Sequence, residues 1–145
     1  MEVNIVDKSE YRNVISDLFS EDELLISKYH VNFGKGLESC IDRTESDFKS
    51  FDSFKLYSIK NNNEIVAFFG KQIVAGNTFM TGFFIKLSHR TKDFILNFWN
   101  IVKETIKAET LYSCVFENNL RAIDFLSKKG SIFGKQNNIV IFKIY

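Results

Sequence analysis

A long amphipathic helix is predicted between two β-forming stretches in the second half of this chain. The flanking stretches are Thr78–Leu87 and Leu111–Phe116, and the helix runs from about Lys92 to Lys107. Its apolar face recurs in steps of three and four, at Phe94, Ile95, Phe98, Ile101, Val102, Thr105 and Ile106. A helix that joins two strands of one sheet is a crossover connection, which makes the strands parallel. The sequence therefore predicts one parallel strand pair.

The middle of the chain predicts an antiparallel meander that leads into this crossover. The expected strands are Phe54–Lys60, Glu64–Val74 and Thr78–Leu87, with turns at Asn61–Asn63 and Gly76–Asn77. Gly82 interrupts the third strand and predicts a β-bulge. The sheet is therefore expected to be mostly antiparallel.

The ends of the chain supply the remaining elements. A strand is predicted at Val3–Val6 and a last strand at Ile139–Tyr145. The first 44 residues also predict three helices. The first is capped by Ser9 and has Val14, Ile15, Leu18 and Phe19 on one face, and the second begins at the Ser20–Glu23 capping box and runs towards Tyr29. The third follows a loop at Gly34 and Gly36 and spans Leu37–Thr44. The fold class is α+β: a mixed sheet with helices on both faces, in a single domain spanning residues 1–145.

Composition and charge exclude several classes of function. A net charge of +1 in 145 residues argues against binding to nucleic acid or a membrane surface by bulk electrostatics. Cys40 and Cys114 have no CxxC spacing, so neither a metal site nor a disulfide framework is expected. No uninterrupted apolar run approaches the roughly 18 residues of a membrane span. The chain is therefore expected to be a cytoplasmic protein.

The stretch LYSCVFENNLRAIDFLSKKG, residues 111–130, predicts a strand, a short turn and a capped helix. Asn119 stands at the N-cap, and Leu120, Ala122, Ile123 and Leu126 form the apolar stripe. Lys128 and Lys129 fall at the end of the helix, and Gly130 is expected to close it in the left-handed conformation. The unit resembles motif B of the Gcn5-related N-acetyltransferase (GNAT) superfamily, with Asn119, Ala122 and Gly130 at the motif's positions. The order of elements is also similar to the GNAT order across essentially the whole chain.

This resemblance implies a binding site for acetyl-coenzyme A in the gap where the parallel strands separate. In the family, the loop before the crossover helix carries an Arg/Gln-x-x-Gly-x-Gly/Ala signature that binds the pyrophosphate. The corresponding residues, together with Asn119, are the expected cofactor contacts: Ser88, His89, Arg90, Thr91, Lys92, Asp93, Phe94 and Ile95. Here Asp93 and Ile95 replace the two small residues. An alternative is that Thr91 and Asp93 are ordinary helix-capping residues and the basic side chains are solvated.

The catalytic groups that the resemblance implies are only partly present. Many family members place a Tyr general acid seven residues after the motif B Asn, and this chain has Leu126 there. The candidates for a general base are Glu117, at the end of its strand, and His89, whose ordinary pKa suits proton transfer near neutral pH. The expected function is an acyl-coenzyme A N-acyltransferase whose catalysis these losses weaken or abolish.

The alternative function is a non-catalytic protein-binding scaffold. From Gly34 to Phe133 the chain is similar to small GNAT-like internal virion or assembly proteins of short-tailed bacteriophages, which share a loop without glycines and a Leu at the Tyr position. That resemblance implies phage structural proteins as partners, and a location in the host cytoplasm or the virion.

Overall fold

The computed structural model describes residues 1–19 and 37–145, which form one mixed sheet with the strand order β1-β2-β3-β4-β5-β7-β6. The strands are β1 (Glu2–Val6), β2 (Lys55–Asn61), β3 (Glu64–Val74), β4 (Asn77–Ile85), β5 (Leu111–Phe116), β6 (Ser131–Gln136) and β7 (Ile139–Lys143). Neighbouring strands are antiparallel except β4 and β5, which are parallel. The predicted mixed sheet with one parallel crossover pair is confirmed. The helix expected from Ser20 towards Tyr29 and the loop at Gly34 and Gly36 lie outside the described residues.

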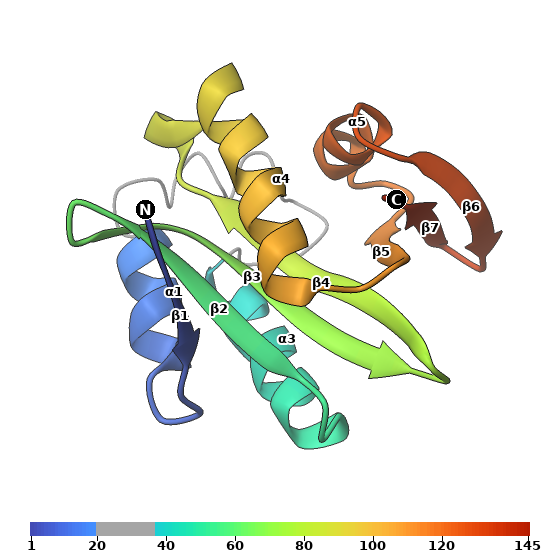
Figure 1. The fold of residues 1–145 in the computed structure, drawn as a ribbon. Helices are drawn as coiled ribbons and strands as arrows, with labels where there is room; N and C mark the ends of the chain where they lie inside the picture. The colour runs from blue at the N-terminus through green and yellow to red at the C-terminus, as the bar shows by residue number, and fades with distance from the viewer. Residues whose placement is uncertain (20–36) are drawn as a thin grey trace.

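Helices cover both faces of the sheet, as predicted (Figure 1). They are α1 (Tyr11–Phe19), α3 (Leu37–Ser50), α4 (Lys92–Ile106) and α5 (Leu120–Ser127), with a short 3-10 turn, η2 (Leu87–His89). One core cluster packs α4 and α5 against the sheet around Phe98, Val102 and Leu126. A second cluster on the other face packs α1 and α3 around Ile15 and Phe68. Among the described residues, every helix is too short or too polar to span a bilayer.

Two helix boundaries differ from the prediction. Helix α1 begins at Tyr11, and Ser9 bonds Asp7 instead of serving as its N-cap. Helix α3 continues six residues beyond Thr44, to Ser50. Its polar second half is stabilised by packing, because the ring centroid of Phe48 lies 4.8 Å from that of Phe54, outside the helix. Long-range contact therefore extends a helix whose own sequence is ambiguous.

The two hairpin turns follow from residues that tolerate positive φ. Asn62 and Asn63 have φ angles of 51° and 66° and connect β2 to β3, as predicted. The second turn lies one residue earlier than predicted. Ala75 and Gly76 carry the positive φ angles, 50° and 79°, while Asn77 already pairs with Val74 in the β3–β4 ladder.

The last third of the chain contains a strand and a glycine role that the sequence did not predict. Strand β6 pairs with β7 at the sheet edge, and its side chains are almost all exposed, so it lacks an alternating apolar pattern. Gly130 is not in the left-handed conformation. It is needed instead because a Cβ there would lie 2.2 Å from the carbonyl oxygen of Lys143.

Candidate functional site

The parallel strands β4 and β5 separate after three residue pairs. Their ladder joins Thr78 to Leu111 and ends with Met80 opposite Ser113. At that last pair, the buried hydroxyl of Ser113 donates a 3.0 Å hydrogen bond to the carbonyl oxygen of Met80. Beyond this bond, β4 and β5 no longer pair with one another.

A β-bulge at Gly82 lies next to the point of separation. In the β3–β4 ladder, Phe69 pairs with Phe83 and Gly70 pairs with Thr81, which leaves Gly82 as the extra residue of β4. Its φ of 54° falls in the region that favours glycine. A bulge bends its strand and increases the local twist. The predicted bulge is therefore present, and it lies where β4 turns away from β5.

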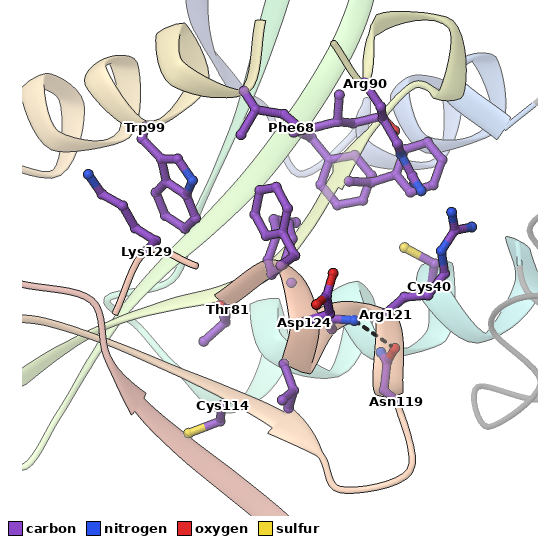
Figure 2. A pocket seen from close by; sticks show the side chains of 18 of the residues that line it. Cys40, Phe68, Thr81, Arg90, Trp99, Cys114, Asn119, Arg121, Asp124 and Lys129 are labelled. Atoms are coloured by element: carbon purple, nitrogen blue, oxygen red, sulfur yellow. Dashed lines mark hydrogen bonds between the residues drawn. The ribbon is translucent and has the colours of Figure 1, made fainter. Parts of the chain in front are cut away.

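A cavity of about 530 Å³ occupies this separation. That volume is within the range of small-molecule sites. Its apolar lining is Phe54, Leu56, Phe68, Phe83, Phe84, Ile85, Ile95, Leu96, Trp99, Val115, Ala122 and Phe125. Its charged lining is Arg43, Asp47, Arg90, Lys92, Asp93, Arg121, Asp124, Lys128 and Lys129. Figure 2 shows Trp99 of α4 and Cys40 of α3 on opposite sides, so the cavity reaches helices on both faces of the sheet.

The loop before α4 is held by its own side chains. The hydroxyl of Thr91 caps α4 by accepting a 3.2 Å hydrogen bond from the amide of Phe94. The Nε of Arg90 donates to the carbonyl oxygen of Ile85 at 2.8 Å, and its guanidinium lies 5.2 Å from the centroid of the Phe84 ring. The loop therefore presents an arginine that is already anchored to β4.

The structure brings only some of the expected cofactor contacts into the cavity wall. Of the loop residues, the lining contains Arg90, Lys92, Asp93 and Ile95. It does not contain Ser88, His89, Thr91 or Phe94. The hydroxyl of Ser88 lies 3.0 Å from Nδ1 of His89, whose ring contacts that of Phe94.

Asn119 lies at the cavity wall and caps α5, as predicted. Its side-chain oxygen accepts a 3.3 Å hydrogen bond from the amide of Ala122, and the residue is 6% exposed. Leu126 occupies the position where the resemblance to GNAT proteins would place a Tyr. It is fully buried in the core and is not part of the lining. That position therefore presents no hydroxyl to the cavity.

Glu117 lies outside the cavity lining. Its carboxylate forms an ion pair with Lys135 of β6, and its amide donates a 2.8 Å hydrogen bond to the carbonyl oxygen of Asn138. Both contacts direct the residue towards the β6–β7 hairpin. Neither base candidate from the sequence, Glu117 or His89, therefore lines the cavity.

Two cavity carboxylates, Asp47 and Asp124, were not among the site residues that the sequence predicted. Asp47 lines the cavity together with Cys40, Arg43 and Thr44 of the same helix. These positions follow the i, i+3, i+4, i+7 spacing of a single helix face. The same spacing was the available signal, but helix α3 was predicted to end before Asp47.

Three other groups in the lining affect its polarity. Burial raises the pKa of the Cys40 thiol to about 12 and also raises that of Cys114, so both thiols are neutral at physiological pH. The hydroxyl oxygen of Thr81 is buried without a hydrogen-bond partner. In the described part of the chain, His, Cys, Asp and Glu side chains nowhere form a cluster of three that could hold a metal ion.

Comparison with known proteins identifies the fold. No protein-family model matches the sequence, and no curated protein matches it. Among solved structures, the chain is similar to an acetyltransferase from Thermus thermophilus, with a TM-score of 0.71 and 13% identity over 99% of this chain and 96% of that one.

Two further similar structures contain a coenzyme. The PaiA N-acetyltransferase from Thermoplasma acidophilum, in complex with coenzyme A, has a TM-score of 0.56 and 12% identity over 99% of this chain and 98% of that one. The Campylobacter jejuni N-acetyltransferase PseH, in complex with acetyl coenzyme A, has a TM-score of 0.57 and 14% identity over 98% of this chain and 97% of that one. The chain therefore has the GNAT acetyltransferase fold.

Proposed function

We propose that this protein is an acyl-coenzyme A-dependent N-acyltransferase that uses acetyl-coenzyme A as its acyl donor. The observation that carries the proposal is the cavity at the separation of β4 and β5, which reaches helices on both faces of the sheet. Such a cavity can receive an acyl donor from one face and an acceptor from the other. Acetyltransferases of the same fold bind coenzyme A or acetyl coenzyme A.

The residues around the separation fit the amide-bearing arm of the donor. Beyond Met80 and Ser113, the facing edges of β4 and β5 no longer pair with each other. An extended chain with amide groups can add to a strand edge through main-chain hydrogen bonds. The unpartnered hydroxyl of Thr81 lies in the same wall and offers a further hydrogen bond. The thioester of the donor would supply the activated acyl group.

The phosphates would be held mainly by side chains. Lys92 lies in the first turn of α4, and Lys128 and Lys129 follow the end of α5. The backbone amides at the start of α4 are less available to a phosphate. The Thr91 hydroxyl already accepts a hydrogen bond from the amide of Phe94, and Asp93 places a negative charge beside the other amides of the first turn. We therefore expect weaker binding than a glycine-rich loop would give, with a strong dependence on salt.

The proposal is tested by titrating the protein with acetyl-coenzyme A in a calorimeter. Binding is expected, and Lys92→Glu or Lys129→Glu should weaken it about tenfold or more, because a hydrogen bond between charged groups contributes roughly 1.5–3 kcal/mol. Lys8→Glu makes the same charge change at an exposed residue outside the lining and should leave the affinity unchanged. Absence of binding at about 1 mM ligand, a standard free energy near −4 kcal/mol, would overturn the proposal.

A non-catalytic protein-binding scaffold is the second candidate. It is favoured by the buried Leu126 at the position of the general acid and by the large exposure of Ile132 and Phe133, 64% and 63%, on edge strand β6. A phage virion or assembly role, which the sequence resemblance implies, belongs to this candidate. It predicts no acetyl-coenzyme A binding in the same titration.

A further inference from the structure

The α3 end of the cavity has a different chemistry from the α4 end. Its wall consists of four apolar side chains, from the residue before β2 and from β2, β3 and β4, namely Phe54, Leu56, Phe68 and Phe84. All four belong to the core cluster on the α1 and α3 face. The other end of the cavity carries Lys92, Lys128 and Lys129, whereas this end is an apolar chamber lined on one side by α3.

Apart from the guanidinium of Arg90, which lies over the Phe84 ring, the polar groups of this chamber come from that face of α3. The hydroxyl of Thr44 donates to the carbonyl oxygen of Cys40 at 2.8 Å, and the Cys40 thiol is neutral. The guanidinium of Arg43 lies 6.0 Å from the centroid of the Phe116 ring. The remaining group is the half-buried carboxylate of Asp47, the only acid that α3, β2, β3 or β4 contributes to the described lining.

Asp47 lacks an ion-pair partner in the described residues. No charged nitrogen of the described residues lies within 4.0 Å of its carboxylate oxygens. Burial raises the pKa of Asp47, and the positive charge of Arg43 opposes that rise. The other two acids of the lining belong to α4 and α5, and Asp124 is already paired with Lys128 at 3.1 Å. A half-buried carboxylate without an ion-pair partner is costly, and a cationic ligand offsets that cost.

We propose that the α3 end of the cavity binds the acyl acceptor, and that the acceptor is a primary amine carried on an apolar body. This inference rests on the proposed function. Asp47 binds the ammonium group, and the apolar body packs against Phe54 and Phe68. A polyamine fits poorly, because its further charges would face the apolar wall or Arg43.

The same geometry makes Asp47 the general base of the transfer. The ammonium group gives one proton to the Asp47 carboxylate, which passes it to solvent. The neutral amine nitrogen then forms a bond to the thioester carbonyl carbon, and the carbon–sulfur bond breaks. The amide product keeps one N–H, while the second proton lost by the nitrogen ends on the sulfur of coenzyme A. The products are an N-acyl amine, coenzyme A and one released proton.

The test measures thiol release from acetyl-coenzyme A with 2-phenylethylamine or spermidine as acceptor, with the acetylated amine identified by mass. The wild-type protein is expected to favour 2-phenylethylamine. Asp47→Asn should lower kcat/KM for this amine about 100-fold or more, the typical effect of losing a general base. Asp42→Asn, on the same helix but exposed and outside the cavity lining, is the matched control and should have wild-type activity.

Calorimetry with acetyl-coenzyme A separates this inference from the proposed function. Donor binding unchanged in Asp47→Asn, with transfer lost, supports the assignment. Three results overturn the inference while the donor still binds: full transfer by Asp47→Asn, a preference of the wild-type protein for spermidine, or no transfer by the wild-type protein to either amine. Each of these results leaves the proposed donor site unaffected. Absence of donor binding overturns both. Should Asp47→Asn not fold, the preference of the wild-type protein between the two amines decides the acceptor class.

Discussion

Replacing Gly130 with Ala should destabilise the protein strongly. A Cβ at this position would lie 2.2 Å from the carbonyl oxygen of Lys143 and 2.9 Å from Cα of Ile144, both of which are backbone atoms. The clash cannot be relieved by turning a side chain. Lys143 is also held from both sides, by its pairing with Ser131 of β6 and with Tyr112 of β5. Either the end of β7 or the connection after α5 must therefore move.

The expected loss is about 3 kcal/mol, at the top of the usual range for overpacking, because backbone must shift. With an unfolding entropy of about 2.1 cal/mol/K per residue over 145 residues, Tm should fall by about 10 °C. Urea unfolding and thermal melting followed by circular dichroism measure both quantities. Gly134→Ala is the control, since a Cβ there meets nothing within 4 Å, and it should be neutral or stabilise by about 0.4–1 kcal/mol.

The Gly130→Asn variant distinguishes steric exclusion from a backbone requirement. If Gly130 closed α5 in the left-handed conformation, Asn would be tolerated better than Ala. Because the obstacle is the Lys143 carbonyl, Asn should destabilise at least as much as Ala. A loss below about 1 kcal/mol for both variants would refute the steric explanation.

Two further predictions concern the cap of α5 and a partly buried ion pair. Asn119→Asp should leave the free energy of unfolding nearly unchanged, because Asp also caps a helix, whereas Asn119→Ala should lower it by about 1 kcal/mol. Urea titrations measure both variants. A loss above about 1 kcal/mol for Asn119→Asp would show that the side-chain amide group of Asn119 has a partner of its own. The hydrogen-bonded ion pair with buried Lys86 lowers the pKa of Glu64. The stabilisation that this ion pair gives the folded protein is therefore present above the ordinary glutamate pKa of about 4.3, and it is lost as the pH falls through the lowered pKa. Glu64→Gln should therefore lower Tm at pH 7 and flatten the fall of Tm below about pH 5; an unchanged acid limb would contradict this origin.

Much of the fold follows from local patterns in the chain. The apolar face of Lys92–Lys107 predicted α4 to within one residue of its end, and its position between two β-forming stretches predicted the parallel pair. Asn119 was recognisable as a cap because a short polar residue follows a strand and precedes an apolar stripe. These features depend on residues within one or two turns of each other, so one sequence suffices to find them.

Strand β6 was missed for a physical reason. It is an edge strand with both faces largely exposed, and its residues therefore need no alternation of apolar and polar types. Its pairing with β7 includes an irregularity between Ile132 and Gly134, which disrupts any regular pattern further. Gly130 was misread for a related reason, since the atoms that exclude a Cβ belong to a strand that follows more than ten residues later.

The candidate site depended on tertiary structure to the greatest degree. By itself, the sequence determined which loop precedes α4, which residue caps α5 and that the seventh residue after Asn119 is a Leu without a hydroxyl, because these are positions along the chain. Only the folded chain decided that Asp47 joins the cavity wall while Glu117 turns to Lys135. A wall assembled from residues between Cys40 and Lys129 is created by long-range packing, and no local period records which carboxylates that packing brings to the cavity.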